Sequence, residues 1–142
     1  MVANKEYITA MIPLIITLWP DNSEDDAGKI AIEYIDGKNK GAFVHFIDDQ
    51  CVGLALCSLR YDYVEGCESS PVGYLEGIVV NEKYRKNGIA KSLCSECEMW
   101  AREKGCKEFA SDCELTNLDS FSFHLSIGFE EENRIICFKK KL

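Results

Sequence analysis

Basic residues are scarce in this chain of 142 residues. Lys and Arg number 16 against 24 Asp and Glu, which gives a formal net charge of −8. Proteins that bind nucleic acids or anionic lipids carry an excess of positive charge, because their partners are polyanions. The composition therefore disfavours both partners and suits a cationic substrate, although an acidic surface can also serve solubility alone.

Long hydrophobic runs are also missing. The apolar stretch at residues 8–19 is shorter than the roughly 20 residues needed to span a bilayer, and its apolar positions are spaced as in an amphipathic helix. One Lys and one Glu precede it and no small-residue cleavage site follows it, unlike a secretory signal. We therefore expect a cytoplasmic protein without a membrane span.

Histidine is rare, and this limits the chemistry open to the eight cysteines. The only CxxC motif joins Cys94 and Cys97, with no second pair or histidine at zinc spacing, so no metal site is expected. No local signature of a Cys–His nucleophilic enzyme is present either. Cys97 falls on the apolar stripe of a predicted helix. We interpret the cysteines as reduced thiols that act mostly as small apolar residues.

The apolar periodicities predict a single domain over residues 1–142, of the α/β class, with a mixed sheet covered by helices. We expect helices at residues 8–19, from Ser23 to about Gly37, at 88–105 and at 117–127. Strands are expected at residues 42–47, 51–61, 74–80 and 108–112, and a last strand begins at Phe129 and includes residues 135–138. No linker divides the chain.

Local signals set several of these boundaries. Ser23 precedes three acids and is typical of a helix N-cap. Pro13 should bend the first helix or mark its true start. Asp48 and Asp49 form the turn of a predicted antiparallel hairpin, and residues 62–72 form a loop rich in acids and small residues.

The stretch at residues 74–93 organises the chain. An apolar strand turns at Asn81-Glu82 and opens a helix at Gly88. Such a turn exposes unpaired N–H groups at the positive end of the helix dipole, which bind phosphate. The Gly-Lys-Ser/Thr ending of a Walker loop is absent, and Gly88 alone cannot supply the three glycines of a dinucleotide-binding motif.

The segment Arg85-Lys86-Asn87-Gly88-Ile89-Ala90 has the pattern Arg-x-x-Gly-x-Ala. It resembles the pyrophosphate cradle of the GNAT family, the acetyl-CoA-dependent N-acetyltransferases. The predicted order of elements is also that of the GNAT acyl-CoA N-acyltransferase fold, and the resemblance covers nearly the whole chain.

Further segments narrow the resemblance within that family. Together they look like the chromosomal type of aminoglycoside 6′-N-acetyltransferase, an enzyme class that confers antibiotic resistance. The segments are Leu18-Trp19-Pro20, residues 60–66 leading into 69–72, Leu75-Glu76-Gly77-Ile78, Ala110-Ser111-Asp112 and Gly128-Phe129-Glu130-Glu131.

The resemblance implies where each ligand lies. Acetyl-CoA is expected on the central strand, on the cradle and at the start of the next helix, at Ile78, Val79, Val80, Lys86, Asn87, Gly88, Ile89, Ala90, Lys91 and Asn117. The aminoglycoside is expected at Trp19, Tyr63, Glu76, Asp112 and Asn133. The resemblance also suggests a homodimer, with the C-terminal strand as a contact.

Elementary chemistry agrees with the expected substrate site. Carboxylates pair with the ammonium groups of an aminoglycoside, and aromatic faces cover its sugar rings. Trp19 could equally be a core residue at a helix end, and Tyr63 could serve loop packing alone. Glu76 is less easily explained by structure, because a carboxylate in an apolar strand is costly without a partner.

The implied reaction is direct acyl transfer, in which a free amine attacks the thioester. Glu76 is the first candidate for the base that receives the amine proton, directly or through water, and Asp112 is the second. The N–H of Val80 is expected to polarise the carbonyl. Many family members place a proton-donating Tyr where this chain has His124, which can donate a proton or serve structure alone.

Three other functions remain open from the sequence. The acceptor could be another amine, such as a polyamine, an amino acid or a protein N-terminus. The chain could bind CoA without turnover, although the presence of Glu76 and Asn117 argues against this. A nucleotide-binding protein is the third alternative.

Overall fold

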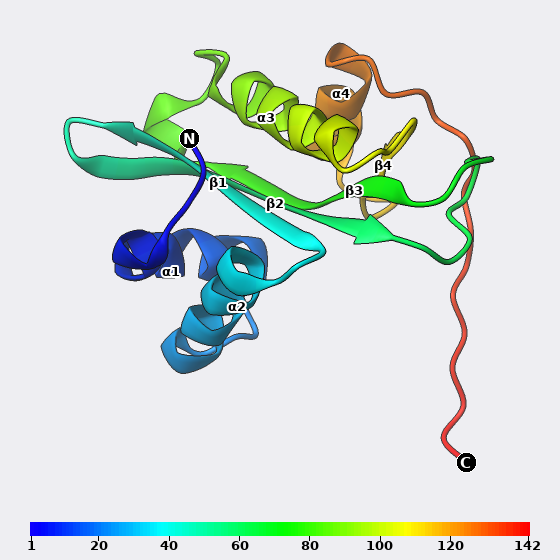
Figure 1. The fold of residues 1–142 in the computed structure, drawn as a ribbon, viewed down its shortest axis with the longest axis horizontal. Coiled ribbons are helices and arrows are strands. Elements are labelled where there is room, and N and C mark those ends of the chain that lie inside the picture. Colours follow the sequence, from blue (N-terminus) through cyan, green and yellow to red (C-terminus); the bar gives the residue numbers. More distant parts are fainter.

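Two helices lie against one face of the sheet (Figure 1). The computed structural model describes all residues, 1–142. A short 3-10 helix, η1 (Lys5–Tyr7), leads into α1 (Ile8–Leu18), and α2 (Glu24–Asp36) follows. Ser23 caps α2 as predicted, since its hydroxyl accepts the N–H of Asp26 at 3.1 Å. Pro13 lies inside α1 and does not mark its start.

The sheet has four strands in the order β1-β2-β3-β4. These are β1 (Lys40–Ile47), β2 (Gln50–Arg60), β3 (Val72–Val80) and β4 (Phe109–Ser111). The first three are antiparallel and β4 runs parallel to β3, which makes the sheet mixed, as predicted. Asp48 and Asp49 form the predicted hairpin turn, with positive φ angles of 47° and 63°.

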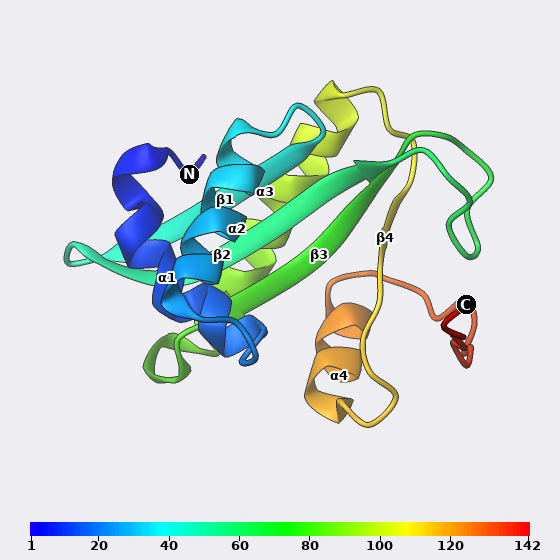
Figure 2. The ribbon, with the colours of Figure 1, turned by 90° about the horizontal axis from the view of Figure 1, so that it is seen from below.

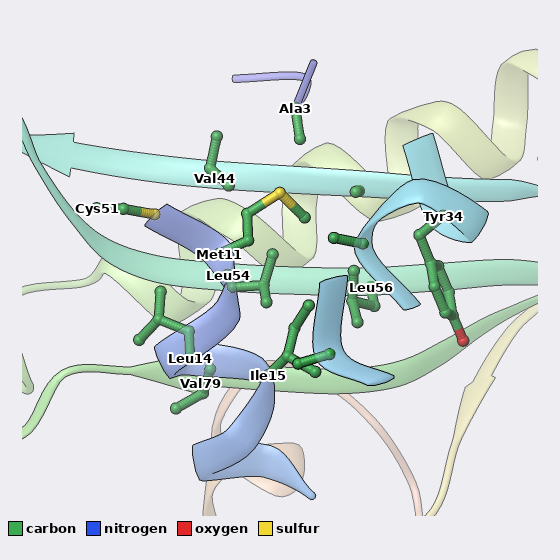
Figure 3. Packing of buried hydrophobic residues seen from close by; sticks show 13 residues of the cluster. Ala3, Met11, Leu14, Ile15, Tyr34, Val44, Cys51, Leu54, Leu56 and Val79 are labelled. Atoms are coloured by element: carbon green, nitrogen blue, oxygen red, sulfur yellow. The ribbon is translucent and has the colours of Figure 1, made fainter. Parts of the chain in front are cut away.

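The opposite face of the sheet is covered by α3 (Ile89–Glu103) and α4 (Leu118–Ser126), with a 3-10 turn, η2 (Glu82–Tyr84), before α3 (Figure 1). The sheet therefore separates two apolar clusters. Figure 3 shows the α1 side, where Met11 and Ile15 pack on Leu54 and Leu56, all of them fully buried. Truncating such a residue to Ala costs roughly 2–5 kcal/mol.

All eight cysteines are free, and five of them are buried. Cys57, Cys94 and Cys97 belong to the apolar cluster between α3 and the sheet. Burial, with the nearby Glu98 carboxylate, raises the pKa of Cys94 to about 12. The Cys94 thiol therefore stays protonated, and all three side chains pack as apolar groups. No group of His, Cys, Asp or Glu side chains is placed to hold a metal ion.

None of the helices is long and apolar enough to cross a membrane.

The predicted last strand is wrong. Residues 129–142 have no regular secondary structure and run away from the sheet (Figure 1). Ile136 and Phe138 are 80% and 90% exposed. A strand needs a neighbour to satisfy its backbone N–H and C=O groups, and the tail pairs with no strand of its own chain. Its apolar pattern therefore predicted a strand without identifying a partner for it.

Candidate active site

The strands β3 and β4 pair only at their first residues. Gly73 pairs with Phe109, Tyr74 with Ala110 and Leu75 with Ser111. Beyond Leu75, β3 continues to Val80 while the chain after β4 turns toward α4 (Figure 2). A cavity of about 1000 Å³ opens there. It is lined by residues 75–80 of β3, by 84–86 and 88–91 before and in α3, by 111–113, and by residues along α4.

A β-bulge lies at the mouth of this opening. Cys57 of β2 pairs with Leu75, and Leu56 pairs with Gly77, so Glu76 between them has no partner residue on β2. A bulge of this kind re-aims a side chain and increases the local twist of the strand. Glu76 itself lines the cavity.

The backbone of β3 beyond the bulge presents hydrogen-bond donors to the cavity. The N–H of Asn81 donates to the carbonyl of Val52 at 2.7 Å. Because bonded and non-bonded pairs alternate along an antiparallel ladder, the N–H groups of Val80 and Ile78 point away from β2, toward the cavity. The carbonyl of Val80 is already engaged, since Arg85 Nε donates to it at 3.1 Å.

The N-terminus of α3 forms the other end of the cavity. Gly88 is its N-cap, with φ 76° and no side-chain cap. The N–H groups of Ile89, Ala90 and Lys91 therefore lie in the first turn, where a helix has no acceptors of its own for them. Asn87 alone of the predicted cradle does not line the cavity, and its amide donates to the carbonyl of Tyr84 at 3.2 Å.

Glu76 has the partner that its position requires. Arg60 donates from Nε to Oε1 at 3.0 Å and from Nη2 to Oε2 at 2.8 Å. Ser58 donates to Oε1 at 2.5 Å. Both carboxylate oxygens are thus occupied, on a side chain that is only 20% exposed. The sequence predicted the need for a partner but identified neither Arg60 nor Ser58.

Asp112 is held from the neighbouring strand. The hydroxyl of Tyr74 donates to its Oδ2, and the Tyr74 ring lies 3.4 Å below the Arg60 guanidinium carbon. Burial raises the pKa of Tyr74, and the hydrogen bond to Asp112 adds to this, so the phenol keeps the proton that it donates. Asp112 lines the cavity, and its Oδ1 atom accepts no hydrogen bond within the protein.

His124 lies in the α4 wall of the cavity. Its Nδ1 is 2.6 Å from the carbonyl oxygen of Ser120, so this nitrogen carries a hydrogen. Its Nε2 is 2.8 Å from the hydroxyl of Ser111. The Ser111 hydroxyl also lies 3.2 Å from the carbonyl oxygen of Leu75, which connects α4 to β3 through β4.

Of the remaining candidate site residues, only Asn117 lines the cavity. Asn117 lines the cavity and caps α4, accepting the N–H of Ser120 at 3.1 Å. Trp19 ends α1, where a Cβ added at Gly77 would be 3.2 Å from its indole. Tyr63 is 78% exposed in the loop, and Asn133 donates to Glu65 at 2.7 Å. The structure does not bring Trp19, Tyr63 or Asn133 into the cavity lining.

The split between β3 and β4, with helix and strand N–H groups facing it, defines the class of acyl-CoA-dependent acetyltransferases. Residues 8–129 match the model of the acetyltransferase (GNAT) family, and the chain belongs to this family.

Several proteins similar to this chain belong to one group within that family. The chain is 38% identical to the aminoglycoside N(6′)-acetyltransferase type 1 of Serratia marcescens, an alignment that covers 100% of this chain and 98% of the relative. It is 34% identical to that of Acinetobacter baumannii, over 100% and 97%. Among solved structures, AAC(6′)-Iy with the bisubstrate analogue CoA-S-monomethyl-acetylneamine has a TM-score of 0.95 at 36% identity, covering 100% of this chain and 97% of that one.

Proposed function

We propose that the chain transfers the acetyl group of acetyl-CoA to the 6′-amino group of aminoglycosides and so confers resistance to these antibiotics. One observation carries this proposal. A single cavity has free backbone N–H groups at one end and two ordered carboxylates at the other. The first end suits a thioester with phosphates, and the second suits a polycationic amine. Relatives with this activity match over the full length of the chain.

The cavity residues fit acetyl-CoA. The N-terminus of α3, with Lys86 and Lys91 beside it, offers donors and positive charge to the pyrophosphate. The N–H groups of Ile78 and Val80 can hold an extended pantetheine arm as a neighbouring strand would. Asn117 has its Nδ2 group left to donate, because only its Oδ1 is used in capping α4. AAC(6′)-Iy, which has the same fold at a TM-score of 0.96, is known in complex with CoA.

The end of the cavity that carries Glu76 and Asp112, the amine end, binds the amine substrate. Asp112 is the better base of the two carboxylates, because Oδ1 is open whereas both oxygens of Glu76 accept bonds from Arg60 and Ser58. As the amine nitrogen attacks the thioester carbon, Asp112 takes the amine proton, directly or through water. The N–H of Val80 stabilises the oxyanion that forms. Trp19, Tyr63 and Asn133 belong to the outer part of this substrate site.

The CoA thiolate leaves with the electron pair of the broken C–S bond and needs a proton. Ser111 and His124 both line the cavity, and the Ser111 hydroxyl is 2.8 Å from Nε2 of His124. A proton passed from Ser111 to the thiolate is replaced through the hydrogen bond between the Ser111 hydroxyl and Nε2 of His124. This assigns His124 the donor role that Tyr has elsewhere in the family.

The protein is expected in the cytoplasm, and the exposed tail supports a homodimer. Ile135, Ile136 and Phe138 are exposed in one short segment, and β4 is paired on one side only. A second copy of the chain offers the same open strand edge, so each tail can add a strand beside the partner's β4.

A tail variant tests this assembly. We expect Phe138→Asp, combined with Ile136→Asp, to convert a dimer to a monomer, because a charge on a buried strand removes the apolar contact. Light scattering after size exclusion measures the mass, and Lys140→Asp is the charge control. A monomeric wild-type protein would contradict the proposed dimer.

Thiol release from acetyl-CoA tests the function itself. Kanamycin A carries a 6′-amine, and lividomycin carries a 6′-hydroxyl. Turnover with kanamycin A alone is expected. Tight acetyl-CoA binding without turnover of either compound would overturn the substrate assignment and direct the search to polyamines and other amines.

A further inference from the structure

We propose that Arg60 is the positioning residue of the amine end of the cavity, which fixes Glu76 by direct bonds and Asp112 through Tyr74. This inference rests on the proposed function, because it concerns how the amine substrate is received. Arg60 itself does not line the cavity. It acts through residues that do.

The contact with Glu76 is a two-point contact. The guanidinium donates from Nε and Nη2 to the two carboxylate oxygens, at 3.0 and 2.8 Å. Two parallel bonds fix the plane of the carboxylate as well as its position, which one ammonium cannot do. The bulge leaves Glu76 without a partner residue on β2, so its direction depends on Arg60 and Ser58.

The contact with Asp112 is indirect. The guanidinium carbon lies 3.4 Å from the centre of the Tyr74 ring, and the hydroxyl of that ring donates to Asp112. A cation over a tyrosine ring is attracted to it and keeps the ring in place. Tyr74 is 6% exposed, so its ring is fixed by packing, and the Arg60 guanidinium stacks on it. Arg60 therefore connects β2, β3 and β4 at the point where the sheet opens.

The positive charge of Arg60 gives the two carboxylates different roles. Its positive charge neutralises Glu76, whereas Asp112 keeps an open oxygen. An incoming ammonium group is repelled by the guanidinium and attracted by Asp112. Arg60 thus directs the reacting amine to Asp112 and away from Glu76.

Steady-state kinetics with kanamycin A tests the role. We expect Arg60→Gln to lower kcat/KM for kanamycin A by roughly 100-fold, since a small misplacement of the reacting groups has an effect of that size. The dissociation constant for acetyl-CoA, measured by calorimetry, should stay unchanged. Arg60→Lys should recover little, because it keeps the charge and loses the fork. Arg102→Gln, on the exposed side of α3, is the matched control with wild-type kinetics.

A double-mutant cycle separates positioning from folding. If Arg60 acts through Glu76, adding Arg60→Gln to Glu76→Gln lowers kcat/KM much less than adding it to the wild type. The double variant also lacks the unpaired carboxylate that could destabilise Arg60→Gln alone. Equal losses in both backgrounds would show that Arg60 does not act through Glu76 and would overturn that half of the inference, whereas a parallel loss of acetyl-CoA affinity would overturn all of it. An inactive wild type would overturn the proposed function, and this inference with it, whereas normal turnover by Arg60→Gln would overturn the inference alone.

Discussion

At the α3 end of the cavity the groups that face a ligand belong to the backbone, whereas at the β4 end they are side chains held by other side chains. The first end consists of N–H groups of β3 and of the first turn of α3. The second consists of Glu76, Asp112 and the residues that hold them, Arg60 and Tyr74. A backbone site tolerates most side-chain changes, and a side-chain network does not. Substitutions should therefore impair the α3 end, the cofactor end, less than the β4 end, the amine end.

The largest effect is expected from Asp112→Asn. The amide cannot accept the amine proton as a carboxylate does, so kcat/KM for kanamycin A should fall by roughly 100-fold or more. Acetyl-CoA affinity should not change, because the cofactor end keeps all its groups. Asp36→Asn, at the exposed end of α2, serves as the control. If Asp112→Asn lowered kcat/KM for kanamycin A and acetyl-CoA affinity equally, the proposed difference between the two ends of the cavity would be wrong.

A smaller effect is expected at the cofactor end from Gly88→Val. Gly88 has φ 76°, which costs a side chain with a branched Cβ about 2 kcal/mol. The strain should shift the first turn of α3 and weaken acetyl-CoA binding by about 10-fold. Calorimetry measures the affinity, and KM for kanamycin A should change little.

Gly105→Val is the matched control for that variant. Gly105 has φ 88°, lies beyond the other end of α3, and leaves open space for a Cβ, as Gly88 does. It should cause the same strain and lower Tm, while acetyl-CoA affinity stays at the wild-type value. If both variants lose affinity equally, the helix N-terminus has no special part in binding.

The smallest effect concerns the face of α3 that packs on the sheet. Burial raises the pKa of Cys94 from its ordinary 9.0 to about 12. Between these values the unfolded chain loses the thiol proton and the folded chain keeps it, so the free energy of unfolding falls as the pH rises. Urea unfolding across this range should show a smaller fall for Cys94→Ala than for the wild type. Cys137→Ala, at an exposed thiol, should fall as the wild type does.

The sequence allowed the strand, turn and helix N-terminus at the α3 end of the cavity to be predicted, because their signals are local. A strand, a turn and Gly88 follow one another within the chain, and backbone geometry does the rest. The hairpin turn at Asp48 and Asp49 and the cap at Ser23 were predicted for the same reason.

The side chains at the β4 end of the cavity were predicted only in part. Glu76 and Asp112 stood out as carboxylates at strand positions, but their partners come from other strands. Arg60 lies 16 residues before Glu76, and Tyr74 lies 38 residues before Asp112. The bulge at Glu76 depends on strand register, which the apolar pattern does not specify. The last strand failed for a related reason, since its pattern identifies no pairing partner within the chain.

The position of the acetyl group on the product tests the account most directly. Kanamycin A is incubated with acetyl-CoA labelled with carbon-13 in the acetyl group, and the product is examined by nuclear magnetic resonance. The account predicts one acetyl group, bonded to the 6′-nitrogen. Acetylation at another amine, or unchanged kanamycin beside intact acetyl-CoA, would contradict it.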